Sequence, residues 1–236
     1  MQSIKKTDSL EAYQKKMAHN RRVKAQAKAV IKRSKLAGIP DKYMRINQSS
    51  FLSLLDDNYH NNPQKVSDFI YKTPMALLKK EFIIIDGGGV VERKRASYAI
   101  LFRLIACDKY GSHWNNNNLS HLFRDNRSNF EGMYRNDITG RLRSMDVVSI
   151  SEILMKDFPT TFDTGRFYDD FLSFRDDHVK TTILSFSNPL SIRKSAETDK
   201  NTWSDQERFG QYICSSAQSD RTKDSRFLRI RVKQNG

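Results

Sequence analysis

Apolar residues occur in short runs along the chain, and the make-up of these runs predicts alternating strands and helices. Runs rich in β-branched residues at 81–86, 147–150 and 181–186 are typical of buried strands. Residues 226–232 alternate charged and apolar side chains, which predicts a strand with one exposed face. Strands that alternate with helices indicate an α/β fold with a parallel sheet flanked by helices. The helices expected between the strands cover 63–78, 93–107, 164–174 and 203–218, with a further short strand starting near 112.

The amino-terminal part of the chain predicts a long basic helix. Residues 8–36 contain no proline or glycine, and Gly38 followed by Pro40 is a typical helix end. Apolar side chains form only a thin stripe, so the cationic surface is either a solvated face or an arm that binds nucleic acid or a partner. We therefore divide the chain into a helical extension, 1–37, and one α/β domain, 38–236. The cations in question are Arg21, Arg22, Lys24, Lys28, Lys32 and Arg33.

The overall charge narrows the class of partner. The chain has 41 Lys and Arg residues against 27 Asp and Glu, a formal net charge of +14, which favours a polyanion such as nucleic acid. Every apolar run is shorter than the roughly 18 residues of a membrane span, so we expect a cytoplasmic protein without a membrane partner. Cys107 and Cys214 are too few for a disulfide framework, and we expect buried free thiols.

A glycine loop follows the first predicted strand. Gly87, Gly88 and Gly89 stand between an apolar strand and a helix, which is the order of a phosphate-binding P-loop. An intact loop reads G-x-x-x-x-G-K-[ST], so that backbone N–H groups and the lysine hold phosphates while the hydroxyl ligates Mg²⁺. The alternative interpretation is a glycine turn between a buried strand and a basic helix start.

The loop departs from the P-loop motif in either alignment. If the motif begins at the first glycine, Glu92 replaces the second glycine, Arg93 the lysine and Lys94 the hydroxyl residue. If it begins one residue later, Lys94 keeps the lysine position between Arg93 and Arg95. Both alignments lose the glycine and the hydroxyl that phosphate and metal binding need. If nucleotide binds at all, we expect Gly87, Gly88, Gly89, Arg93 and Lys94 to hold it.

The later strands carry two further candidate residues. In P-loop ATPases a second strand ends in an acid that holds Mg²⁺, often followed by a glutamate that orients water. Ser151 stands at the position of the metal ligand, and Glu152 keeps the glutamate. Asn188 follows the strand at 181–186, where it can contact a phosphate or act as a turn residue before proline. We treat Glu152 and Asn188 as vestiges of a catalytic site, and we expect no metal site.

The order of these segments resembles the bacterial helicase-loader family of AAA+ ATPases, the DnaC/DnaI/IstB-like group. The resemblance begins at Gly38-Ile39-Pro40-Asp41-Lys42-Tyr43, continues through the glycine loop and 147–153, and includes Arg175 to Asn188. It implies that Asn188 is the family's sensor asparagine. In the segment 209–216, Tyr212 and Ser216 replace the two arginines that the family carries there, which include the finger acting between subunits.

The resemblance implies a role in DNA replication, but the changed motifs imply a pseudo-ATPase that has lost ATP and Mg²⁺ as cofactors. It implies single-stranded DNA and a replicative helicase or transposase as partners. It also implies a protein encoded by a bacterium, or by a virus or mobile element in a bacterial host, which forms homo-oligomers if the family's ring is kept. Alternatives are an IstB-type transposition accessory protein, a weak ATPase using Lys94 and Glu152, and a structural subunit of a nucleoprotein complex. A zinc site is not expected, because His113 and His121 have no cysteine nearby.

Overall fold

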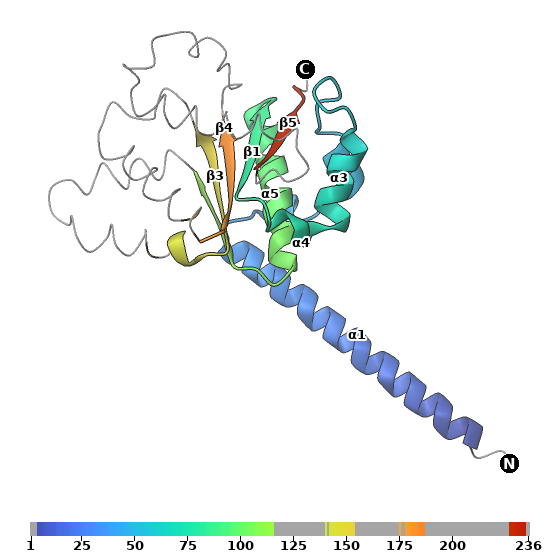
Figure 1. Cartoon of the computed structure of the whole chain (residues 1–236). Helices are drawn as coiled ribbons and strands as arrows, with labels where there is room; N and C mark the ends of the chain where they lie inside the picture. The colour runs from blue at the N-terminus through green and yellow to red at the C-terminus, as the bar shows by residue number, and fades with distance from the viewer. Residues whose placement is uncertain are drawn as a thin grey trace, which may run out of the picture.

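The computed structural model describes residues 4–115, 140, 142–153, 175, 178–186 and 227–234. Five strands form one parallel sheet in the order β2-β3-β4-β1-β5 (Figure 1). This arrangement confirms the α/β fold with a parallel sheet. The strands are β1 (Phe82–Gly87), β2 (Gly111–Asn115), β3 (Val147–Ile153), β4 (Thr181–Phe186) and β5 (Phe227–Val232).

The helices differ in how they meet this sheet. The helix α5 packs on it and contacts β1, β2, β3 and β4, whereas α1 meets the body near its carboxyl end and projects away from it (Figure 1). Among the described residues, no helix combines the length and the apolar character needed to cross a membrane. The described helices are α1 (Ile4–Leu36), η1 (Asp41–Tyr43), α2 (Gln48–Leu52), α3 (Pro63–Lys72), α4 (Pro74–Leu77) and α5 (Val90–Ala106).

The core explains why the β-branched runs are strands. All six residues of β4 are buried, and so are the first five of β1, as expected for parallel strands covered on both faces. The α5 side chains Ala96, Ile100 and Leu104 pack into the same cluster as Ile83 and Ile85 of β1. Complete burial of each large aliphatic side chain contributes about 1.5–3 kcal/mol, so this contact fixes α5 over the centre of the sheet.

Some element boundaries, and the burial of one cysteine, differ from the sequence expectation. The helix after the glycine loop begins at Val90, and the segment 63–78 is divided because Pro74 cannot continue α3. Cys107 lies at the end of α5 and is only partly buried, so the expectation of a buried thiol was wrong there. The helices predicted at 164–174 and 203–218, and Cys214, lie outside the described residues.

A buried arginine joins the amino ends of β3 and β4. Arg175 is fully buried, and loss of hydration lowers the pKa of its guanidinium to about 10. It donates to four backbone carbonyls and one hydroxyl, which compensate the guanidinium for its lost hydration. Its acceptors are the carbonyl oxygens of Leu142, Met145, Asp146 and Thr181 and the hydroxyl of Thr182.

The outer edge of β5 is covered by the loop after α2. The backbone N–H of Asp56 donates to the carbonyl of Arg231 at 2.9 Å, and that of Lys233 donates to Leu54 at 2.9 Å. Leu55 also forms an antiparallel bridge with Val232. This cover satisfies backbone groups that an open sheet edge would expose, and it fixes the end of β5 beside the glycine loop.

Candidate functional site

The glycine loop lies at the carboxyl end of β1, packed against β5. Gly87 and Gly88 have φ angles of +75° and +49°, in the left-handed region that side chains disfavour. A Cβ atom on Gly87 would lie 2.6 Å from the carbonyl oxygen of Val232, and one on Gly88 would lie 2.8 Å from that of Lys233. The first two glycines therefore have a structural role that is independent of any ligand.

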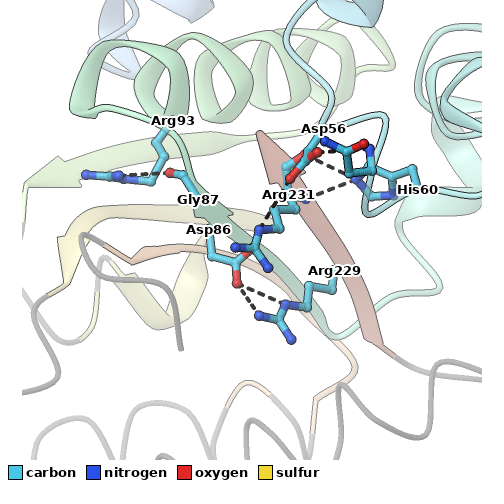
Figure 2. A network of polar contacts seen from close by, with 8 residues as sticks. Asp56, His60, Asp86, Gly87, Arg93, Arg229 and Arg231 are labelled. Carbon is cyan, nitrogen blue, oxygen red and sulfur yellow. Dashed lines mark hydrogen bonds and ion pairs between the residues drawn. The ribbon is translucent and has the colours of Figure 1, made fainter. Parts of the chain in front are cut away.

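The Arg93 side chain turns back from α5 onto this loop. It is only 3% exposed, and its Nη1 atom donates to the carbonyl oxygens of Gly87 at 2.9 Å and Gly88 at 2.8 Å (Figure 2). Its Nη2 atom lies 3.6 Å from a carboxylate oxygen of Glu152 on β3. Arg93 thus connects the loop to the neighbouring part of the sheet through a buried ion pair.

This geometry favours one of the two motif alignments. Arg93 reaches back over the loop from the position where the alignment starting at Gly87 places the lysine. In the same alignment Glu92 replaces the second glycine, and its Oε2 atom lies 2.6 Å from the position that a Cβ atom on Gly89 would take. A carboxylate at that place repels phosphate oxygens at short range. The residues present therefore fit a nucleotide phosphate poorly.

A local irregularity of β3 aims Glu152 at Arg93. Glu152 has a φ of +61°, and the pairing of β3 with β4 shifts between Ile150 and Ile153. Irregularities of this kind bend a strand and redirect a side chain. The glutamate that the sequence presents as a water-orienting residue lies beside the Arg93 guanidinium.

Ser151, which stands at the position of the metal-binding acid, contacts another side chain of the protein. The Ser151 hydroxyl lies 3.2 Å from Nε2 of His113, and the Ser149 hydroxyl lies 3.0 Å from Nδ1 of the same ring. Burial, and to a smaller extent the nearby Lys94 cation, lower the pKa of His113 to about 4. His113 is therefore neutral at pH 7, and its two ring nitrogens have hydroxyl partners on β3.

His113 is a residue whose role the sequence did not reveal. From the sequence, His113 was considered only as a zinc ligand with His121, and a zinc site was not expected. Its pairing with Ser149 depends on the register of β2 against β3. Among the described residues, no group of three or more potential ligands is arranged to hold a metal ion. Asn188 and the segment 209–216 lie outside the described residues, so their roles stay predictions.

Comparisons with solved structures identify this arrangement of strands and loop. A crystal structure of DnaI matches with a TM-score of 0.54 and 13% identity, covering 82% of this chain and 94% of that one. The replication initiator DnaA bound to AMPPCP and single-stranded DNA matches with a TM-score of 0.50 and 11% identity, covering 81% of this chain and 50% of that one. A crystal structure of the DnaC helicase loader matches with a TM-score of 0.46 and 16% identity, covering 81% of this chain and 99% of that one.

The chain shares its fold with DnaI and with the matched part of DnaA. The resemblance found in the sequence is thereby confirmed at the level of fold. No protein-family model matches the sequence, and no curated protein matches it either. Within this fold, the glycine loop lies at the carboxyl end of β1, and Ser151 and Glu152 lie toward the carboxyl end of β3, on the other side of β4. This edge is where ligands of open α/β sheets bind.

The cations of β5 are matched by carboxylates. Arg229 donates twice to the fully buried Asp86 carboxylate, with an Nε to Oδ2 distance of 3.0 Å (Figure 2). Arg231 lies 3.5 Å from Asp56, and Lys233 lies 3.9 Å from Asp57. Three cations thus face three carboxylates, which leaves this surface of β5 without excess charge.

His60 adds a neutral contact to the same surface. Its Nε2 atom lies 3.1 Å from the backbone nitrogen of Arg231, whose N–H can only donate, so the ring accepts. Burial lowers the pKa of His60 and favours this neutral form. The polar residues around β5 therefore hold the edge cover in place.

The basic helix presents a different charge environment. We call residues 12–32 of α1 the arm; its residues 12–29 are all exposed. The predicted binding residues from Arg21 to Lys32 lie on it, whereas Arg33 is partly buried and forms a 2.7 Å ion pair with Asp108 that docks the helix. Binding by these cations stays a prediction, and the position of Arg33 separates it from the other five.

Proposed function

We propose that this protein is a helicase-loader-like accessory protein of DNA replication, built on the AAA+ fold but unable to hydrolyse ATP. The position of Arg93 is the observation that supports the loss of ATP hydrolysis. Its guanidinium is buried, donates to the loop carbonyls and forms an ion pair with Glu152. The fold shared with DnaI and DnaA supports the replication role. The division between extension and domain at residue 37 belongs to the same proposal.

The proposed loss of hydrolysis rests on four changes that act together. Glu92 stands against the loop, Arg93 replaces the lysine, and Ser151 replaces the acid that would ligate Mg²⁺. The segment 209–216 lacks both arginines, and the absence of an arginine finger alone costs about 10³-fold or more in rate. A weak ATPase that uses Lys94 and Glu152 is the competing hypothesis, and Glu152 serves it poorly because it is paired with Arg93.

The proposed partners are DNA and a replicative helicase. The net charge of +14 and the exposed cations of the arm support a polyanionic partner. The DnaA structure with a similar fold is bound to single-stranded DNA, which supports DNA as the class of nucleic acid. The surface around Arg229 and Arg231 contributes little to this proposal, because nearby carboxylates neutralise its cations.

The deciding experiment is capture of the host's purified replicative helicase by the full-length chain. A complex that survives size-exclusion chromatography supports the proposal. Binding to a transposase and not to the helicase would favour the IstB-type alternative. Binding to neither, with stable incorporation into a larger nucleoprotein complex, would favour a structural subunit.

A further inference from the structure

We propose that the arm binds the phosphate backbone of double-stranded DNA. This inference rests on the proposed function only for the class of partner, and it assigns the form of DNA and the residues that hold it. The central residues are Arg21, Lys24, Lys28 and Lys32, all exposed on the surface of α1.

The arm concentrates positive charge in a segment without acidic residues. Between Ala12 and Pro40 the sequence has nine lysines and arginines and no acidic residue. Two of the nine are paired, Arg33 with Asp108 and Lys35 with Asp41, which leaves seven. On β5, by contrast, each of the three cations has a carboxylate partner. A polyanion therefore gains most at the arm.

Helix geometry places the four central cations opposite the docked side. At 3.6 residues per turn, Arg21, Lys24, Lys28 and Lys32 follow one another along one side of the helix. The buried Ser34 and half-buried Val30, which meet the body, lie on the other side. The row stays open to solvent even at Lys32, where α1 has already reached the domain. It extends over about 17 Å, at 1.5 Å per residue.

The side chains between the cations suit a duplex better than a single strand. Single-strand binding usually combines cations with stacking aromatic residues, and between Ala12 and Leu36 the sequence has only Tyr13 and His19 with such rings. Ala18, Ala25 and Ala29 lie along one flank of the cationic row, and the exposed Met17 and Ile31 lie along the other, so one flank can approach the DNA surface closely. A duplex offers one phosphate charge per roughly 1.7 Å, and its major groove accepts an α-helix.

Charge also argues against a second copy of this chain as the partner of the arm. Two arms placed side by side would bring together rows of like charge, without acidic residues to offset the repulsion. The exposed apolar side chains along the arm, such as Met17, Val23 and Ile31, are separated by polar residues and form no continuous seam.

The test is a salt titration of the full-length protein with a labelled DNA duplex and with one of its strands. With about four phosphate contacts, duplex affinity should fall about 100-fold between about 50 and 200 mM salt. The different salt slopes of duplex and single strand predict about tenfold tighter binding to the duplex at about 50 mM salt. Substitution of Arg21, Lys24, Lys28 and Lys32 by glutamine should weaken duplex binding at least about 100-fold and flatten the salt dependence.

A matched control separates the arm from overall charge. Glutamine at Lys42, Arg45, Lys65 and Lys79 removes the same number of charges from exposed positions on the body. This variant should retain the affinity and salt slope of the wild type. Glutamine is a good helix former, and circular dichroism should show unchanged helix content in the arm variant.

Three results would overturn the proposal: equal or tighter binding to the single strand, equal losses in the arm and control variants, or no duplex binding at low salt. The last result would favour an acidic protein surface, instead of DNA, as the partner of the arm. Helicase capture is measured separately, so its persistence without duplex binding would refute this inference and leave the proposed function standing. Duplex binding without helicase capture would support this inference and refute the proposed function.

Discussion

Gly88 combines a left-handed backbone with close packing against the residue after β5. Gly88→Ala should lower the free energy of unfolding by about 2 kcal/mol or more, because a Cβ atom would overlap the Lys233 carbonyl at 2.8 Å. Urea denaturation measures the change. Gly140→Ala is the control: its helical position is open, so it should be neutral or stabilise by up to about 1 kcal/mol. Equal effects of the two substitutions would contradict this account.

His113 should make folding sensitive to acid. Burial, and then the Lys94 cation, lower the pKa of His113 from 6.5 in the unfolded chain to about 4 in the folded one. The unfolded state binds the extra proton, so stability present above pH 6.5 is lost as the pH falls toward 4. The complete loss amounts to about 3 kcal/mol.

Denaturant unfolding at neutral pH and near about pH 5 tests this dependence, because the loss should already reach about 2 kcal/mol there. The variant His113→Asn should lose that part of the pH dependence, whereas His19→Asn, on the exposed arm, should keep it. An unchanged pH profile in the His113 variant would show that another group is responsible.

Arg93 illustrates what residue spacing leaves open. The motif can be aligned in two registers, and the sequence does not decide whether Arg93 or Lys94 takes the lysine position. The buried contacts of Arg93 with Gly87, Gly88 and Glu152 favour the first register. Those contacts depend on where β3 lies relative to the loop, which is a property of the folded sheet.

At the scale of elements, the exposed arm and the docked carboxyl end of α1 should contribute very differently to the free energy of unfolding. Residues 12–29 are exposed, so removal of residues 1–28 should change the free energy of unfolding by less than about 0.5 kcal/mol. The same truncation should abolish duplex binding if the arm acts as proposed. Chemical denaturation and the DNA titration measure these two effects on one protein.

The control truncation extends through residue 36. It removes the Arg33–Asp108 ion pair and the buried Ser34, and it should cost about 2 kcal/mol. A large loss of stability from the shorter truncation would mean that the arm packs on the body.

Elements were predicted well where the pattern was local. The β-branched runs gave β1, β3 and β4, and Gly38 with Pro40 marked the end of α1. Charge alternation predicted β5 as a strand but not its partner, since β5 pairs with β1 from the opposite end of the domain sequence. The alternation also did not predict that the fold would bring Asp56, Asp57 and Asp86 beside the cations of this segment.

For the whole molecule, the proposed loss of nucleotide binding predicts that Mg²⁺ and ATP will not raise the melting temperature. A ligand at about 100 times its dissociation constant stabilises a binding protein by about 2.7 kcal/mol, which a thermal scan detects readily. No Mg²⁺-dependent turnover should be measurable, and Lys94→Ala should change neither result. A rise in melting temperature that Lys94→Ala removes would instead support the weak ATPase.

The sequence by itself determined the described strands and the helix that follows the glycine loop, the excess of positive charge and the departure from the P-loop motif. Each of these depends on residues that are near one another in the chain. Tertiary structure alone decided that Arg93 bonds to the loop, that His113 joins Ser149 and Ser151, and that β5 is neutral while the arm is not. These features depend on strand order, register and side-chain direction, which arise from contacts between residues far apart in sequence.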